Sequence, residues 1–415
     1  MIFTEQKTVP AKGHTEVVDR AVPVTCTETG LTEGKHCAVC GLIFTEQKTV
    51  PVKGHTEVVD RAVPATCTET GLTEGKHCAV CGLIFTEQET VPAKGHNYIA
   101  KEVNPTYIAN GYTLYSCSVC GYSYKDNETA KLTLAKVTGF KVKSIFSTNV
   151  TLQWNKNTSA SGYEIEQYKS GKWTNVAKIT GNATTSYTVK GLAAGTAGYQ
   201  FRIRAYRTEG KNKAYSGYSS VVKVNTNPYG VGGFKCSSKT STSVTLKWNK
   251  GTTASGYQLQ QYKNGKWVTI YTANKATNTS YTVKKLKAGT AGYRFRIRAY
   301  KIYGNTKQYG SWSSEVKVNT NPYGVGGFKA KSTAKNSITL GWNKGTTASG
   351  YQLQQYKGGK WVTVYTGTKA TSTSYTVKSL KANTSYKFRI RAYKTYGNTK
   401  QYGSWSKVLT VKTKR

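Results

Sequence analysis

A repeat of 41 residues constrains the first third of this sequence more than any other feature does. The segment GKHCAVCG at 34–41 returns at 75–82, and a weaker copy, YSCSVCG, stands at 115–121. Repeats of such a period are typical of arrays of small modules. About 40 residues cannot bury a sufficient apolar core, so we expect each unit to need a metal ion or a disulfide.

Short β-prone runs, such as Val17-Val18 and Ile43-Phe44, alternate with Pro and Gly in each unit. This pattern predicts short strands and turns with almost no helix. The repeats occupy residues 1–96, with the first unit truncated, and a degenerate unit follows at 97–135.

Zinc binds four nitrogen or sulfur ligands at the corners of a tetrahedron, and two of them often come from a C-x2-C turn. Each complete unit has the pattern C-x10-C-x2-C, and a histidine follows after 14 intervening residues. The pattern predicts two structural zinc sites, one formed by Cys26, Cys37, Cys40 and His55, the other by Cys67, Cys78, Cys81 and His96.

The cysteines also allow two other interpretations. A disulfide could join two of the three thiols of a unit and leave the third free, although an odd count disfavours this pairing. A redox-active C-x-x-C motif lacks its usual context, because nothing nearby resembles a βαβ unit. The sequence alone leaves metal and disulfide open.

The degenerate unit differs from the others at the residues that would bind a metal. It keeps Cys117 and Cys120, but Tyr107 stands where the other units have their first cysteine, and no histidine follows. We therefore expect no complete four-ligand site in this unit, and we expect it to act as a structural cap.

These units resemble the short Cys-containing repeats of surface proteins in gut Firmicutes. The resemblance rests on TCTETGLTEGKHCAVCG at 25–41 and 66–82, on the flanking Gly-His pairs, and on GYTLYSCSVCGYSY at 111–124. It covers about residues 1–130 and implies a location at a bacterial cell surface, without implying an activity.

A second period, of 94 residues, organises the rest of the chain. It relates Trp154, Trp248 and Trp342, and the linker NTNPYGVGGF occurs at 225–234 and again at 319–328. Apolar and polar residues alternate, as in NVTLQW, without helical periodicity. The alternation predicts strands with one buried face.

These segments resemble the fibronectin type III domain. The matching features are an early tryptophan (SVTLKWNK, 243–250), a Gly-Tyr that opens the next strand (GYQLQQY, 256–262), and a tyrosine corner (LKAGTAGYRFRIRAY, 286–300). The resemblance implies an all-β fold with three Greek-key sandwiches of seven strands. Their expected bounds are 137–226, 229–320 and 323–413.

Charge divides the sequence in the same way as the repeats do. Residues 1–135 contain 15 acidic and 12 basic residues, whereas the rest of the chain contains 4 acidic and 48 basic residues and no histidine. A glycosidase needs two placed carboxylates, and acid–base or triad catalysis needs groups that this half lacks. We therefore predict that the protein is not an enzyme.

Basic side chains alternate with apolar ones along the strand that carries each corner tyrosine, which places them on the outer face of the sheet. An anionic polymer would suit a basic sheet with interleaved tyrosines, and the alternative is an ordinary solvated surface. The predicted polymer-binding residues are Arg294, Arg296, Arg298, Tyr262, Tyr300, Arg389, Arg391, Tyr356 and Tyr393. We expect a cell-wall polymer, a host glycan or a host protein as the partner, and no specific nucleic acid.

Location is predicted from the two resemblances. No apolar run is long enough to span a membrane, and no signal peptide is visible. Met1 stands where Leu42 and Leu83 stand in the later units, so we expect a truncated start. We predict a secreted or cell-surface monomeric rod that acts as a spacer or adhesion module with weak multivalent binding. The alternative is an accessory C-terminal part of a larger extracellular enzyme.

Overall fold

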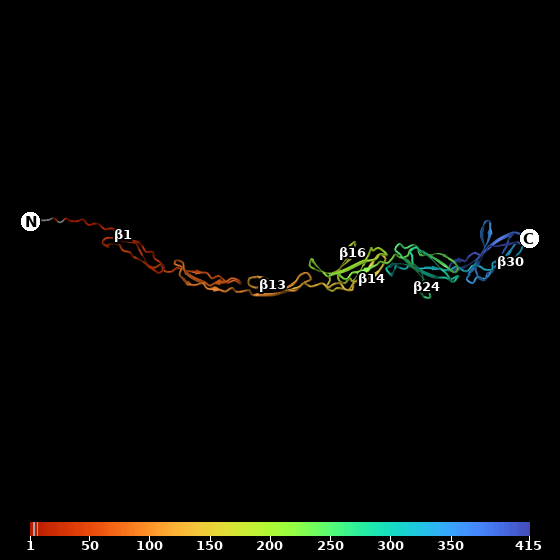
Figure 1. Cartoon of the computed structure of the whole chain (residues 1–415), viewed down its shortest axis with the longest axis horizontal. Coiled ribbons are helices and arrows are strands. Elements are labelled where there is room, and N and C mark those ends of the chain that lie inside the picture. Colours follow the sequence, from red (N-terminus) through yellow and green to blue (C-terminus); the bar gives the residue numbers. More distant parts are fainter. Residues whose placement is uncertain (3–4, 6) are drawn as a thin grey trace. The chain divides into compact units, whose positions relative to one another are not determined.

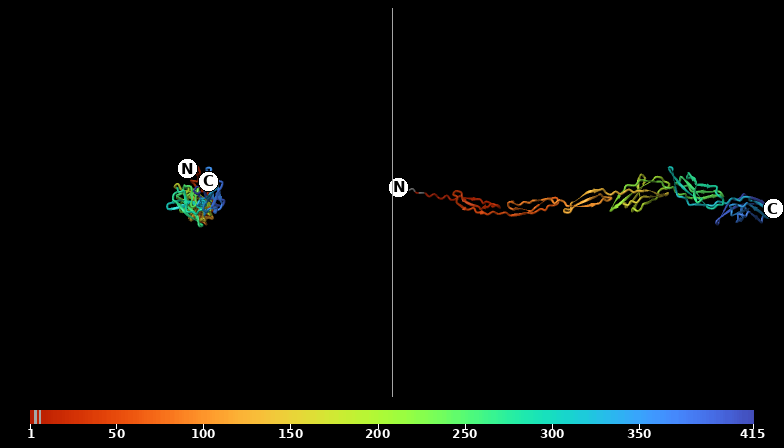
Figure 2. Two further views of the ribbon diagram at one scale, coloured as in Figure 1. Left: turned by 90° about the vertical axis from the view of Figure 1, so that its right-hand side faces the viewer. Right: turned by 90° about the horizontal axis from the view of Figure 1, so that it is seen from below.

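Strands and connecting loops make up the whole of the computed structural model, which describes every residue except 3, 4 and 6 (Figures 1 and 2). The described residues contain no helix, so none that could cross a membrane. The chain forms two units, Met1–Leu132 and Thr133–Arg415. The predicted all-β fold is confirmed.

The first unit consists of three antiparallel repeats. Each repeat is a three-stranded sheet whose central strand leads into a C-x2-C turn. The sheets are β1 (Glu16–Asp19), β3 (Gly34–Cys37) and β4 (Ile43–Thr45) in repeat 1, then β6 (Glu57–Asp60), β8 (Gly75–Cys78) and β9 (Ile84–Thr86) in repeat 2, and β11 (Tyr98–Val103), β12 (Gly111–Cys117) and β13 (Ser123–Thr129) in repeat 3.

Repeats 1 and 2 each add a two-stranded ribbon. It pairs β2 (Gly30–Leu31) with β5 (Thr49–Val50), and β7 (Gly71–Leu72) with β10 (Thr90–Val91). Apolar side chains of these repeats remain exposed, as Val18 does at 45%. Their buried side chains are mainly cysteines, so these two repeats have almost no apolar core.

Repeat 3 adds an aromatic cluster on its longer strands. The rings of Tyr115 and Tyr124 stack with centroids 5.1 Å apart, and Tyr98 meets Tyr124 edge-on at 5.1 Å. Aromatic pairs in these geometries stabilise a sheet beyond the area they bury. Repeat 3 thus has a partly exposed cluster of aromatic rings on its sheet.

The second unit consists of three β-sandwiches, each with a three-stranded and a five-stranded sheet. Sandwich 1 pairs β14 (Lys141–Ile145), β15 (Val150–Gln153) and β18 (Ser186–Val189) in the smaller sheet. Its larger sheet contains β17 (Lys172–Thr180), β16 (Gly162–Lys169), β19 (Tyr199–Glu209), β20 (Asn212–Tyr215) and β21 (Val222–Val224).

Sandwiches 2 and 3 repeat this topology strand by strand. Sandwich 2 has β22 (Lys235–Lys239), β23 (Val244–Lys247) and β26 (Ser280–Val283) facing β25 (Lys266–Ala273), β24 (Gly256–Lys263), β27 (Tyr293–Tyr303), β28 (Thr306–Tyr309) and β29 (Val316–Val318). Sandwich 3 has β30 (Lys329–Thr333), β31 (Ile338–Gly341) and β34 (Ser374–Val377) facing β33 (Lys360–Gly367), β32 (Gly350–Lys357), β35 (Ser385–Tyr396), β36 (Thr399–Tyr402) and β37 (Leu409–Lys412).

The alternating residues of the strands form the sandwich cores. In sandwich 2, Trp248 is 4% exposed, and Leu259 and Ile297 are fully buried. The tyrosine corner is present as the sequence predicts, because the Tyr293 hydroxyl accepts a hydrogen bond from the backbone N–H of Lys287 (2.9 Å). Matching bonds hold the corners of sandwiches 1 and 3.

Successive sandwiches contact one another through the hairpin of the later one. The Tyr303 hydroxyl donates to the backbone oxygen of Thr226 in sandwich 1 (2.8 Å). The Tyr396 hydroxyl donates in the same way to the backbone oxygen of Thr320 in sandwich 2 (3.0 Å). The nearly identical hairpin sequences of sandwiches 2 and 3 therefore serve one repeated junction.

Candidate metal centres

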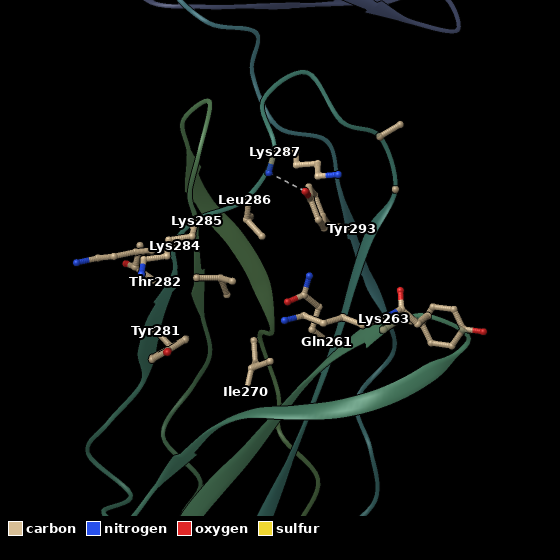
Figure 3. Close-up of a pocket in the computed structure, with 15 residues that line it drawn as sticks. Gln261, Lys263, Ile270, Tyr281, Thr282, Lys284, Lys285, Leu286, Lys287 and Tyr293 are labelled. Atoms are coloured by element: carbon tan, nitrogen blue, oxygen red, sulfur yellow. Dashed lines mark hydrogen bonds between the residues drawn. The ribbon is translucent and has the colours of Figure 1, made fainter. Parts of the chain in front are cut away.

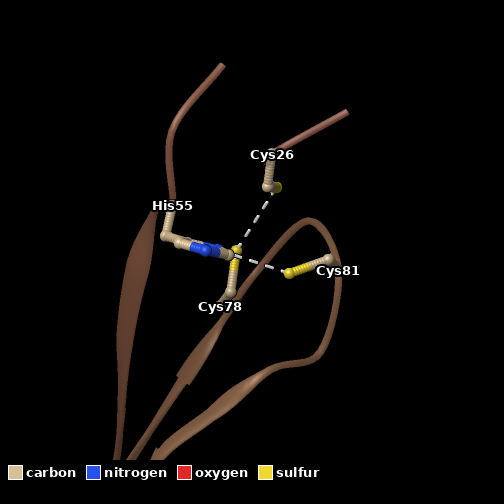
Figure 4. Close-up of side chains that lie close together, drawn as sticks. All are labelled: Cys26, His55, Cys78 and Cys81. Atoms are coloured by element: carbon tan, nitrogen blue, oxygen red, sulfur yellow. Dashed lines mark hydrogen bonds between the residues drawn. The ribbon is translucent and has the colours of Figure 1, made fainter. Parts of the chain in front are cut away.

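Two clusters of four potential ligands lie within the first unit. In each cluster one nitrogen or sulfur atom per residue lies within 4.8 Å of the others. Figure 4 shows the first cluster, in which the side chains converge from separate segments of the chain. The clusters are formed by Cys26, His55, Cys78 and Cys81, and by Cys67, His96, Cys117 and Cys120.

The C-x2-C turn supplies two ligands of the first cluster. Cys78 ends β8, its backbone oxygen accepts from the N–H of Gly82 (2.9 Å), and Gly82 adopts a φ of 75° that favours glycine. The turn also directs the N–H of Val80 at the Cys78 sulfur (3.4 Å). Backbone donors of this kind stabilise a thiolate, which is the form that binds metal.

Two other segments complete the cluster. His55 precedes β6, and its ring packs edge-on against Phe85 with centroids 5.5 Å apart. Cys26 belongs to repeat 1 and lies in a bend that is held to the chain ahead of His55, because the N–H of Lys53 donates to the backbone oxygen of Thr25 (3.1 Å).

The distances within the clusters fit a tetrahedral metal site. The sulfurs of Cys26 and Cys78 are 3.8 Å apart, and those of Cys67 and Cys117 are 3.9 Å apart. Two thiolates about 2.3 Å from one tetrahedral zinc ion lie about 3.8 Å apart, whereas disulfide sulfurs lie about 2.05 Å apart. The donor set, three sulfurs and one imidazole nitrogen, is one that zinc prefers.

The thiols of one cluster differ in their pKa values because their surroundings differ. Backbone N–H groups of the turn, that of Cys81 first, lower the pKa of Cys78 to about 5. Burial, followed by the neighbouring thiols, raises the pKa of Cys26 to about 11. The turn therefore favours the thiolate form of Cys78. A bound cation would offset the cost of the buried thiolate form of Cys26.

The structure corrects the predicted grouping of the ligands. Cys37 pairs across the sheet with Glu16, at the start of β1, whereas Cys26 follows the far end of that strand. A strand of four residues separates them by roughly 10 Å or more. Cys37 and Cys40 therefore lie beside His14, and Cys26 reaches the C-x2-C turn of the next repeat.

Repeat 3 also differs from the expectation. Its Cys117 and Cys120 form a complete cluster because Cys67 and His96 come from the segment before it. The sequence does contain a signal for this grouping, because a C-x2-C turn follows each Gly-His pair along the chain. The histidine belongs with the turn after it and not with the turn before it. In repeat 1, the cluster of His14, Cys37 and Cys40 has three ligands among the described residues.

The histidines next to the C-x2-C turns have another role. Nδ1 of His77 lies 2.7 Å from a carboxylate oxygen of Asp60 across the sheet. His36 makes the same contact with Asp19 (2.7 Å). These histidines stabilise the β1–β3 and β6–β8 pairs and stand outside the clusters.

The residues predicted to bind a polymer lie on the five-stranded sheets of sandwiches 2 and 3. Arg294, Arg296 and Arg298 project from β27, and their equivalents project from β35. Tyr262 contacts Arg294, and Tyr356 is 43% exposed. The structure corrects the placement of Tyr300 and Tyr393, which are 1% and 2% exposed.

A hollow lies beside the sheet edges of sandwich 2. Its lining includes Gln261, Ile270, Lys284 and Lys285 (Figure 3). Its lining includes no carboxylate, histidine or cysteine among the described residues. This hollow therefore lacks the paired carboxylates of glycosidases and the histidine of a catalytic triad.

Comparison with known proteins identifies the second unit. Residues 135–222, 229–317 and 323–411 match the family model described as Fibronectin type III domain. Exoglucanase B of Cellulomonas fimi is 29% identical over 298 residues, which cover 67% of this chain and 25% of that protein. Chitinase A1 of Niallia circulans is 33% identical over 186 residues, 42% of this chain and 24% of that protein.

Exoglucanase A of Cellulomonas fimi is 32% identical over 282 residues, which cover 63% of this chain and 30% of that protein. The chain thus spans about a quarter of the length of the curated relatives it matches. Among solved structures, the FN1–FN3 domains of chicken CNTN1 are 17% identical with a TM-score of 0.28, over 68% of this chain and all of that one.

Proposed function

Because the chain belongs to the fibronectin type III domain family, we propose that it is a non-catalytic extracellular spacer whose Cys repeats are joined by structural zinc ions. The inter-repeat clusters carry this proposal. Cys26 of repeat 1 and the Cys78–Cys81 turn of repeat 2 converge with sulfurs 3.8 Å apart. An ion bound there ties two repeats together.

The number of protein ligands in each cluster favours a structural ion over a catalytic one. Catalytic zinc keeps an open coordination position for water or substrate, whereas structural zinc has four protein ligands. Each inter-repeat cluster supplies four. When bound, zinc would link the segments that no apolar core holds, and its binding free energy would contribute to folding.

The second unit supports the spacer role. Three of the matched relatives are named as exoglucanases or as a chitinase, and the similarity covers only 24–30% of each of these three. Glucan and chitin are polymers met outside the cell, which favours an extracellular location here too. The sandwiches themselves contain four acidic residues and no histidine, so they lack the means for hydrolysis.

A second candidate is the accessory part of a larger extracellular enzyme. The small share of each relative that the chain covers favours it. Both candidates assign the described residues the same spacer role. Immunoblotting of culture supernatants with an antibody against the sandwiches distinguishes them, because an accessory part runs as one polypeptide with a catalytic domain.

The test of the zinc proposal is metal analysis of the purified full chain, prepared anaerobically with zinc. We expect two tightly held zinc ions per chain after a chelator of moderate affinity has emptied the three-ligand cluster. Cys26→Ser should remove one ion, whereas Cys37→Ser should leave both. The reverse, or equal loss in the two variants, would overturn the inter-repeat assignment.

Cys236→Ser is the matched control, because Cys236 lies in sandwich 2, far along the chain from either cluster. It should retain both ions. A chain without metal that loses its thiols in air would establish disulfides and refute the zinc proposal. Since all variants differ by one oxygen-for-sulfur exchange, misfolding is monitored by the circular dichroism of the sandwiches.

A further inference from the structure

Arginines and aromatic rings alternate across the outer face of sandwich 2. The Arg296 guanidinium lies between Trp267 (4.4 Å to the ring centroid) and Trp312 (4.2 Å). Arg298 lies between Trp312 (4.4 Å) and Tyr309 (3.7 Å). We call this stack the arginine ladder of sandwich 2. Stacking fixes each guanidinium, so little side-chain entropy remains to be lost on binding.

The ladder arginines of sandwich 2 have amide partners instead of carboxylates. Nε and Nη2 of Arg296 donate to Oε1 of Gln260 (2.9 and 2.7 Å), and Nε of Arg298 donates to Oε1 of Gln258 (2.8 Å). Nη1 of Arg296 and both Nη atoms of Arg298 have no hydrogen-bond partner among the described residues. Arg294, at the end of the stack, is paired with Glu315 (2.8 Å).

Sandwich 1 has the same ladder with its charge neutralised. Arg202 contacts Glu166 at 2.6 Å, and Arg204 contacts Glu164 at 2.7 Å. The Tyr218 hydroxyl also donates to Glu166 (2.7 Å), at the place that Trp312 occupies in sandwich 2. The replacement of two glutamates by glutamines thus leaves two positive charges uncompensated on one fixed surface.

Sandwich 3 repeats the uncompensated ladder. Arg389 lies between Trp361 and Trp405 (4.4 and 4.2 Å), and Arg391 lies between Trp405 and Tyr402 (4.3 and 3.7 Å). Residues 323–413 contain 16 basic residues and no acidic one. No carboxylate of this sandwich can therefore pair with the ladder.

We propose that the arginine ladders of sandwiches 2 and 3 bind a linear polyanion through its phosphate or sulfate groups. Guanidinium groups match such oxyanions in charge and in hydrogen-bond donors. Two ladders on one chain contact one polymer at two places, which raises the overall affinity. Burial lowers the pKa of Arg298, a cost that a bound anion would offset. The spacer role does not depend on this interaction.

The test converts both ladders to the neutral form of sandwich 1. The quadruple variant Gln258→Glu, Gln260→Glu, Gln352→Glu and Gln354→Glu keeps the stacked rings and places carboxylates as sandwich 1 has them. Its control, Lys284→Gln, Lys285→Gln, Lys378→Gln and Lys381→Gln, changes the net charge by the same four units at exposed lysines near the other sheet. Binding of the full chain to polyphosphate and to dextran sulfate is measured by calorimetry, with neutral dextran as a blank.

We expect the ladder variant to bind about tenfold more weakly or worse, and the lysine variant to lose much less. Equal losses would mean attraction by net charge alone and would overturn the proposal, as would failure of the native chain to bind either polyanion. Binding to polyphosphate only, or to dextran sulfate only, would support it and identify the group. Unchanged thermal unfolding of the sandwiches excludes misfolding as the cause.

Discussion

The ring of Tyr300 lies against Gly256 on the neighbouring strand, and its hydroxyl donates to the backbone oxygen of Ala273 (2.9 Å). A Cβ atom on Gly256 would stand 2.5 Å from the Tyr300 hydroxyl. The glycine thus leaves the space that lets an outward-facing tyrosine fold down and cover the sheet. Sandwiches 1 and 3 repeat the pair.

Gly256→Ala should therefore destabilise sandwich 2. The added methyl displaces the Tyr300 ring and meets the backbone of β25, so we expect a loss of about 1–3 kcal/mol in the free energy of unfolding. Chemical denaturation followed by tryptophan fluorescence measures it. Gly230→Ala is the control, because the nearest heavy atom to its Cβ is 4.0 Å away, and it should change little.

Gln308→Ala should loosen the junction between sandwiches 1 and 2. The side chain donates to the backbone oxygen of Asn225 (2.7 Å) and to Oδ1 of Asn227 (2.9 Å), and each such bond contributes about 1 kcal/mol. NMR relaxation should show sandwich 1 tumbling more independently of sandwich 2. The junction between sandwiches 2 and 3 keeps its Tyr396 bond and serves as the internal control; equal loosening of both would contradict the prediction.

Low pH should destabilise sandwich 2, because protonation of Glu315 removes its ion pair with Arg294. Its bond to Arg294 lowers the pKa of this carboxyl below the ordinary 4.5. Because the folded pKa is the lower one, the ion pair stabilises fully above pH 4.5 and loses its effect as the pH falls through the folded value. The melting temperature of the native chain should approach that of Glu315→Gln as the pH falls below 4.5, and a constant difference down to pH 2 would contradict this.

A strong chelator should unfold the first unit and spare the second. Under the zinc proposal, the fold of residues 1–132 depends on metal bound at the Cys–His clusters, whereas each sandwich has an apolar core of its own. Loss of the dispersed amide resonances of repeats 1 and 2 on chelation, with the sandwich resonances unchanged, would agree. Repeat 3 should retain part of its structure, because Tyr98, Tyr115 and Tyr124 pack without metal.

Sequence patterns predicted the sandwiches well because their determinants are local. The alternation around Trp248 and the spacing of Leu286 and Tyr293 both specify contacts within one sheet or corner. The outward direction of Tyr300 was also expected from its parity with Arg298. The burial of Tyr300 was not expected, because it depends on the missing side chain of Gly256, which lies 44 residues earlier on the neighbouring strand.

The ligand sets were harder to predict for a related reason. Assigning Cys26 to the nearest C-x2-C turn assumes that proximity in sequence means proximity in space. The antiparallel register of β1 and β3 carries Cys37 away from Cys26 and towards His14. The residue types that suit a zinc site are visible in the sequence, but the partner of each cysteine requires the register.

Ligand sharing between neighbours has a consequence for how such an array can change over generations. Repeat 1 supplies Cys26 to the C-x2-C turn of repeat 2, and repeat 2 supplies Cys67 to the turn of repeat 3. A duplication or deletion of one whole 41-residue unit leaves every junction with a complete ligand set, whatever the point of exchange. Tyr107, which replaces the forward cysteine of repeat 3, marks where the series stops. The number of repeats can therefore change by recombination in whole units, without requiring a new kind of contact between repeats.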